Sequence, residues 1–212
     1  MADSPSYRWK KMRLGILGGS FNPVHNGHLA MAEAARQAHN LDLVLFIPAG
    51  RPPHKREDLA PAEDRLEMVR LATEDREGFL ASDIETSRSR ISYTCETLEE
   101  LHRSHPGVEL FFIVGEDSID ELPGWRNPRR ILELSRIVAL NRPGVKAAFR
   151  KEDYPGVAPD VVERMERDRV QMTPCPIESR KIREAIRSGR SIEGLVPAKV
   201  VDYIARRGLY QR

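Results

Sequence analysis

Short apolar runs alternate with longer segments of helical periodicity along most of this chain. The runs predict six strands, at Leu14–Leu17, Leu43–Ile47, Phe79–Ile84, Leu110–Val114, Ile137–Leu140 and Val170–Thr173. Most are rich in β-branched or aromatic residues and do not alternate cleanly between apolar and polar positions. That pattern is typical of a parallel sheet whose two faces are both covered.

Helical patterns fill the intervals between these runs. They predict helices at Gly27–His39, Pro61–Glu74, Thr94–His102, Pro128–Leu134, Ser179–Ser188 and Pro197–Arg207. Asn127 and Pro128 form a good N-cap and first-turn pair, and Gly189 and Gly208 are stop signals for the last two helices. Pro143–Pro159 is the least regular segment and is expected to be a loop. The alternation predicts an α/β fold: a Rossmann-like, doubly wound, mostly parallel sheet with helices on both faces and a small C-terminal helical portion.

Length and composition indicate one domain. The 212 residues can bury a core, and we expect a polar N-terminal tail over residues 1–11 followed by a single domain over residues 12–212. The tail lacks the apolar stretch of a signal peptide, and the longest apolar runs are far too short to cross a bilayer. Cys95 and Cys175 fit neither a disulfide framework nor a zinc site. We therefore expect a cytoplasmic protein with no membrane partner.

The charge pattern favours a small anionic ligand. The formal net charge is only +2, although basic residues cluster locally at Arg51–Arg56, Arg129–Arg130 and Arg180–Arg190. A nucleic-acid groove usually needs a continuous basic face with interleaved aromatic residues, and the chain is only 6% aromatic. An RNA-binding role is therefore a weak alternative, and we expect no nucleic-acid partner.

The stretch from Gly18 to Leu29 carries the strongest chemical signal. It predicts a strand, a glycine turn and a helix that begins beside His25 and His28. Glycines let a ligand approach the backbone, and a helix N-terminus offers N–H groups to an anion. The stretch lacks both Gly-x-Gly-x-x-Gly and a P-loop lysine, so dehydrogenase and P-loop readings lose support. Zinc binding would need further ligands, and a capping or packing role is the other alternative for either histidine.

A second basic helix start lies near the C-terminus. Ser179 precedes a helical pattern and is predicted to be its N-cap, which would direct the first-turn N–H groups and Arg183 toward an anion such as a triphosphate. A solvated basic helix with an ordinary cap is the alternative.

Three other positions have two interpretations each. Trp125 is either a core anchor or an exposed stacking platform. Thr94 is a helix-start hydroxyl or a ligand contact, and Asp117 either reaches a ribose hydroxyl from a strand end or adds charge to a helical first turn. Carboxylates at helical spacing indicate solvated faces, at Glu63, Asp64, Glu67, Glu99 and Glu100.

Several motifs occur in a distinctive order between Met12 and Tyr210. They are His25-Asn26-Gly27-His28, Pro52-Pro53-His54-Lys55, Ile91-Ser92-Tyr93-Thr94, Gly115-Glu116-Asp117-Ser118, Leu122-Pro123-Gly124-Trp125, Arg142-Pro143-Gly144, Ser179-Arg180-Lys181-Ile182-Arg183 and Leu195-Val196-Pro197 with Tyr203-Ile204. In these motifs the chain resembles the nucleotidylyltransferase superfamily, whose hallmark is His-x-Gly-His. Within that superfamily it is similar to the bacterial nicotinate mononucleotide adenylyltransferases.

The resemblance implies a role for each matching residue. It implies catalysis by His25 and His28, and no metal-binding residue. The ATP contacts it implies are Gly18, Gly19, Ser20, Phe21, His25, His28, Ser179 and Arg183. The nicotinate mononucleotide contacts it implies are Asn22, His54, Lys55, Thr94, Asp117, Trp125, Arg126 and Arg142. Glu178 and Arg180 depart from the Ser and Thr that the family usually has, so neither is assigned a contact.

The implied activity is adenylyl transfer from ATP to nicotinate mononucleotide in NAD biosynthesis, with Mg²⁺ accompanying ATP. Because the attacking phosphate is already ionised at pH 7, the work is positioning and charge neutralisation. His28 is expected on the transferring α-phosphate and His25 mainly on the neighbouring phosphates. The alternatives are a sister enzyme acting on phosphopantetheine or nicotinamide mononucleotide, and a non-catalytic nucleotide sensor. The sequence leaves the oligomeric state open, a homo-oligomer included.

Overall fold

A five-stranded parallel sheet forms the centre of the computed structural model, which describes residues 12–51, 59–141, 147–173 and 175–211. The strands are β1 (Arg13–Gly19), β2 (Leu43–Pro48), β3 (Phe79–Ala81), β4 (Glu109–Gly115) and β5 (Ser135–Leu140). Their order across the sheet is β3-β2-β1-β4-β5, and each neighbouring pair is parallel. After β3 the chain crosses back to form β4 beside β1. Strand order therefore switches between β1 and β4, where doubly wound sheets bind ligands.

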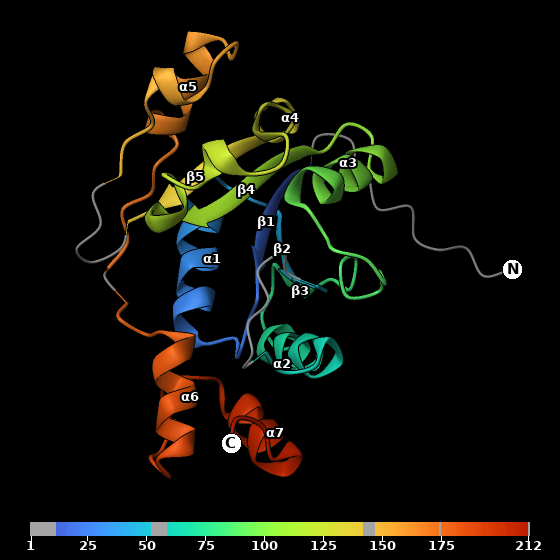
Figure 1. Ribbon diagram of the computed structural model, residues 1–212, viewed down its shortest axis with the longest axis vertical. Helices are drawn as coiled ribbons and strands as arrows, with labels where there is room; N and C mark the ends of the chain where they lie inside the picture. The colour runs from blue at the N-terminus through green and yellow to red at the C-terminus, as the bar shows by residue number, and fades with distance from the viewer. Residues whose placement is uncertain (1–11, 52–58, 142–146, 174, 212) are drawn as a thin grey trace, which may run out of the picture.

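Helices cover both faces of the sheet (Figure 1). They are α1 (Asn26–Ala38), α2 (Ala62–Thr73), α3 (Thr94–Ser104), α4 (Pro128–Leu134), α5 (Pro159–Arg167), α6 (Ser179–Arg187) and α7 (Ala198–Arg207). Neighbouring strand residues point to opposite cores: Phe111 belongs to the core shared with α1, α2, α6 and α7, whereas Phe112 belongs to the core shared with α3, α4 and α5. In Figure 1, α5 lies at one end of the molecule and α6 and α7 at the other. The doubly wound fold and its C-terminal helical portion are confirmed.

The strand predictions are right for four runs, partly right for one and wrong for one. The third strand ends at Ala81 rather than Ile84. Val170–Thr173 is not a strand, because only Val170 forms a bridge, to Leu140. Beyond it the side chain of Asn141, not the backbone, bonds Met172: Asn141 Oδ1 accepts from the Met172 N–H at 2.7 Å, and Nδ2 donates to its carbonyl at 3.2 Å.

The helix α5 was not predicted, because its residues are mostly charged and only Val162 and Met165 are buried.

The glycine turn before α1 was predicted in the wrong place. Gly18 and Gly19 do not form a turn but end β1, where they pair with the end of β2. The turn follows them, with Phe21 at φ 43°. Asn127 precedes Pro128 as predicted but makes no side-chain cap hydrogen bond.

No helix in the described parts of the chain is long and apolar enough to cross a membrane. The division into a tail over residues 1–11 and one domain over residues 12–212 stays a prediction.

Candidate active site

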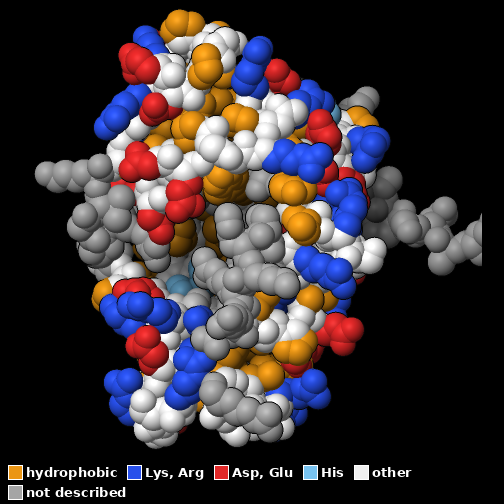
Figure 2. Space-filling model, viewed as in Figure 1, with side chains coloured by type: hydrophobic (Ala, Val, Ile, Leu, Met, Phe, Trp, Pro, Cys, Tyr) orange, Lys and Arg blue, Asp and Glu red, His pale blue; other side chains and the backbone are white. Residues whose placement is uncertain are grey.

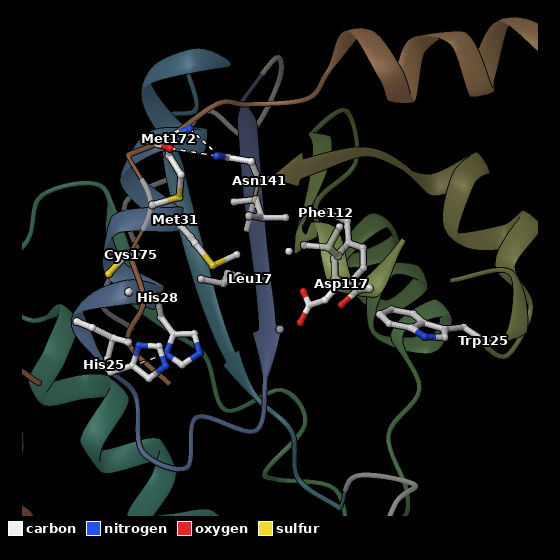
Figure 3. Close-up of a pocket in the computed structure, with 17 residues that line it drawn as sticks. Leu17, His25, His28, Met31, Phe112, Asp117, Trp125, Asn141, Met172 and Cys175 are labelled. Carbon is white, nitrogen blue, oxygen red and sulfur yellow. Dashed lines mark hydrogen bonds between the residues drawn. The ribbon is translucent and has the colours of Figure 1, made fainter. Parts of the chain in front are cut away.

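A cleft opens at the carboxyl ends of β1 and β4, with the start of α1 on one side and the segment after β4 on the other (Figure 3). Its volume is about 180 Å³. The space-filling view shows a hollow near the middle of one face with histidine surface at its floor, and Lys and Arg side chains below it (Figure 2). The cleft thus lies at the switch in strand order.

His25 and His28 lie side by side on the α1 wall of the cleft (Figure 3). Their rings stack with centroids 3.7 Å apart and an interplanar angle of 25°. The backbone N–H of His25 donates to Nδ1 of His28 at 3.2 Å. Since an accepting ring nitrogen carries no proton, this bond assigns the proton of neutral His28 to Nε2. His28 is therefore oriented to offer an Nε2–H donor to a bound anion.

Gly27 lets the His25 ring lie against the start of α1. A Cβ at Gly27 would stand 3.0 Å from Nδ1 of His25 and 3.4 Å from Sγ of Cys175. The N–H of Asn26 donates to the carbonyl of Leu195 at 2.9 Å, and the N–H of His28 donates to the carbonyl of His25 at 2.9 Å. Those two amides are used within the protein, and the two imidazoles add ring nitrogens to this wall. The positive end of the α1 dipole adds to the attraction for an anion.

The loop between β1 and α1 is held from α6. Arg183 donates through Nη1 to the carbonyl of Asn22 at 2.9 Å, and Ser179 donates through Oγ to the carbonyl of Pro23 at 3.0 Å. The N-cap of α6 is Glu178. The predicted N-cap at Ser179 is therefore wrong: Ser179 is the first helical residue, and its hydroxyl contacts the loop. Contacts of Ser179 and Arg183 with phosphate stay predictions.

The residues of that loop occupy different positions. Gly18 is exposed and lines the cleft, whereas Gly19 and Ser20 are half-buried and do not. Phe21 is buried, with its ring edge-on to His28 at 4.9 Å between centroids. Asn22 is buried and its Oδ1 accepts from the N–H of Ala60 at 3.0 Å. Phe21 and Asn22 therefore support the loop from inside.

Asp117 and Trp125 lie across the cleft from the two histidines (Figure 3). Asp117 is exposed and sits in the 3-10 turn Glu116–Ser118 that directly follows β4. Trp125 is half-buried, with its ring edge-on to Phe112 at 5.9 Å and 67°. Trp125 therefore packs against the core by this contact and also lines the cleft, and its stacking on a ligand stays a prediction.

Arg126 and Thr94 do not line the cleft. The guanidinium of Arg126 stacks on Tyr93 at 4.3 Å and lies 3.8 Å from a carboxylate oxygen of Glu96. Arg130 pairs with carboxylates of α3 and α4. The charge of these arginines is thus largely engaged by neighbouring carboxylates. Thr94 is the first residue of α3 and is half-buried.

Three predicted contacts, His54, Lys55 and Arg142, lie outside the described residues. Other residues line the cleft without any sequence signal, namely Met31, Asn141, Met172 and Cys175. They belong to no motif, so only the fold brings them to the site.

Asp64 is not on a solvated face, and that prediction is wrong. It is 3% exposed and accepts hydrogen bonds from the hydroxyl of Tyr203 at 2.8 Å and from Nε of Arg207 at 3.0 Å. Asp64 therefore joins α2 to α7. It plays no part in the cleft.

Comparison with known proteins first defines the class. The family model described as cytidylyltransferase-like matches residues 16–190. Among solved structures, the nicotinic acid mononucleotide adenylyltransferase of Plasmodium falciparum complexed with NaAD has a TM-score of 0.72 at 17% identity, covering 94% of this chain and 97% of that chain. The fold is thus that of a nucleotidylyltransferase.

Sequence relatives then narrow the class. A protein of Geobacter metallireducens named probable nicotinate-nucleotide adenylyltransferase is 43% identical, covering 94% of this chain and 98% of its own length. A protein of the same name from Streptococcus pyogenes serotype M3 is 38% identical, covering 95% of this chain and 90% of its own length. The chain belongs to the nicotinate-nucleotide adenylyltransferase family, as the motifs indicate.

Proposed function

We propose that the protein transfers the adenylyl group of ATP to nicotinate mononucleotide, giving nicotinate adenine dinucleotide and pyrophosphate. One observation carries this function: the stacked His25 and His28 face Asp117 and Trp125 across a cleft at the switch in strand order. This arrangement provides hydrogen-bond donors for phosphate on one wall and an aromatic ring with a carboxylate on the other. Membership of the family supports the same activity.

The reaction is a direct displacement at the α-phosphorus of ATP. An oxygen of the mononucleotide 5′-phosphate forms a bond to this phosphorus. The bond between the α-phosphorus and the oxygen that bridges it to the β-phosphorus breaks, and pyrophosphate leaves. The nucleophile needs no strong base, so catalysis consists of positioning and charge stabilisation. His28 donates from Nε2 to an α-phosphate oxygen, and His25 contacts mainly the neighbouring phosphates.

The two substrates take opposite sides of the cleft. ATP lies over Gly18 and the start of α1, with Ser179 and Arg183 near its outer phosphates. Trp125 stacks on the pyridine ring of nicotinate mononucleotide, and Asp117 accepts from a ribose hydroxyl. The edge-on contact with Phe112 holds the ring of half-buried Trp125 in place for this role.

Mg²⁺ bound with ATP would neutralise charge on the leaving pyrophosphate. Within the described ranges, no group of three or more His, Cys, Asp or Glu residues could hold a metal ion. Mg²⁺ dehydrates reluctantly and is commonly held by substrate phosphates, water and one or two carboxylates. The described donor set therefore fits an ion carried largely by the substrate phosphates and water, while Asp117 is left to the ribose hydroxyl.

Pyrophosphate release from ATP tests this function. We expect release with nicotinate mononucleotide and much less with nicotinamide mononucleotide or phosphopantetheine. Release mainly with either of the other two acceptors identifies a sister enzyme, and release with none of them favours a nucleotide sensor. Either result overturns the proposal.

A further inference from the structure

Arg65 lies entirely inside the protein, on the face of α2 that is turned away from solvent. It is 0% exposed and is the largest fully buried side chain in the described residues. Its guanidinium donates to three backbone carbonyls: Nε to Ala60 at 2.9 Å, Nη1 to Ser20 at 2.9 Å and Nη2 to Gly50 at 3.2 Å. A buried arginine is ordinarily paired with a carboxylate. Here three carbonyl oxygens accept its hydrogen bonds, and the carboxylate of Glu85 interacts with it electrostatically.

The three carbonyls come from three separate segments. Ser20 follows β1, Gly50 follows β2, and Ala60 precedes α2. Gly50 also packs tightly on the segment after β3, because a Cβ at this position would lie 2.1 Å from the carbonyl oxygen of Glu85. Arg65 thus ties the segments that follow β1 and β2 to the segment that enters α2.

A short chain of contacts leads from Arg65 to the catalytic histidines. Arg65 fixes the carbonyl of Ser20, and the next residue is Phe21, whose positive φ of 43° turns the loop. The Phe21 ring lies edge-on to His28 with centroids 4.9 Å apart. On the same side, Asn22 accepts from the N–H of Ala60 at 3.0 Å. Arg65 itself does not line the cleft, so any effect on the reaction passes through this loop.

The geometry requires an arginine in particular. The guanidinium presents five donors in a rigid planar fork, whereas the ammonium of lysine is a compact point charge with a strong hydration shell. Lysine could keep the charge at position 65 but could not reach carbonyls on three sides at once. Replacing Arg65 by lysine therefore separates the two roles, because it keeps the positive charge and removes the three-sided contact with the carbonyls.

We propose that Arg65 is a positioning residue for adenylyl transfer, holding Ser20 and Phe21 so that His28 meets the α-phosphate. This inference rests on the proposed function. It predicts that losing the guanidinium fork lowers kcat more than it changes KM, because a misplaced catalytic group weakens the transition state more than the ground state.

The test compares Arg65→Lys and Arg65→Gln with Val69→Ala. Val69 is 0% exposed on the same helix and belongs to the same core, but its apolar side chain makes no hydrogen bond, so its truncation is a matched loss of stability that leaves the three carbonyl contacts of Arg65 in place. The readouts are Tm, kcat, KM for ATP, and amide hydrogen exchange of the peptide that spans residues 18–29. If Arg65→Gln fails to fold, Arg65→Lys alone decides.

We expect Arg65→Lys to lower kcat about tenfold or more while KM for ATP changes by less than about threefold. The 18–29 peptide should exchange faster than in the wild type, while peptides from β4 are unchanged. Val69→Ala should lower Tm with kcat within about twofold of the wild type and normal loop exchange.

Unchanged kcat and unchanged loop exchange in Arg65→Lys overturn the positioning role and leave Arg65 as a structural residue. A wild-type chain that releases no pyrophosphate with nicotinate mononucleotide contradicts the proposed function instead. In that case loop exchange still decides whether Arg65 orders residues 18–29, so the two failures are distinguishable.

Discussion

Replacing His28 by alanine removes the donor expected to stabilise the transferring phosphate. His28 Nδ1 accepts from the backbone of His25, so its Nε2–H is the group directed to the ligand. Loss of one preorganised donor to developing charge typically costs about 3–4 kcal/mol of barrier. His28→Ala should therefore lower kcat about a hundredfold or more, with kcat/KM falling by a similar factor.

The loss of stability in the same variant should be small. His28 is half-buried, and the variant leaves the His25 N–H without its acceptor, which costs about 1 kcal/mol. The protein should thus remain folded at the assay temperature, as circular dichroism and Tm can check.

His39→Ala is the matched control for His28→Ala. His39 stands at the C-cap of the same helix, where its Nε2 lies 3.0 Å from the carbonyl oxygen of Asp168. It is far along α1 from the cleft, so kcat should stay near that of the wild type. Pyrophosphate release under saturating substrates measures both variants. Near-normal turnover in His28→Ala would refute its assigned role.

Three further predictions follow from single contacts. Gly27→Ala should lower kcat about tenfold, because the new Cβ would stand 3.0 Å from the His25 ring and displace it; pyrophosphate release measures this, and unchanged kcat contradicts it. Trp125→Ala should raise KM for nicotinate mononucleotide about fivefold or more, with KM for ATP unchanged and Trp125→Phe largely restoring binding; equal effects on both substrates argue against stacking. Although burial raises the pKa of Glu166, hydrogen bonds from Arg169 and a backbone N–H lower it overall from 4.5. The ionised form is therefore favoured in the folded state, and its stabilisation is present above pH 4.5 and lost as pH falls through the lowered pKa. Tm measured from pH 6 to pH 3 should fall less in Glu166→Gln than in the wild type, and parallel curves would contradict this.

The doubly wound sheet follows from strong local patterns. Leu110–Val114 is apolar throughout, as a strand must be when Phe111 and Phe112 face different cores. Val170–Thr173 alternates apolar and polar residues, which also favours a strand, but it fails as one because Asn141 turns its side chain onto Met172 and replaces the backbone ladder. That substitution depends on tertiary contact, which a local pattern does not contain.

The candidate site was predictable where it carries a motif and not where it depends on burial. Three separate motifs singled out the histidine pair, Asp117 and Trp125, and the fold places all of them on one cleft. Arg65 gave no signal, since one arginine in a charged helix resembles a solvated residue until its carbonyl partners are known. Asp64 was wrongly predicted to be solvated for the same reason, because its burial depends on partners in α7 that the local pattern does not contain.

The fate of the α-phosphorus is the most direct test of adenylyl transfer at this cleft. The wild-type protein is incubated with Mg²⁺, nicotinate mononucleotide and ATP labelled at the α-phosphate, and the labelled products are separated. We predict that label enters nicotinate adenine dinucleotide in step with pyrophosphate release. Label that remains in ATP, or that appears in AMP without dinucleotide, would contradict the proposed reaction.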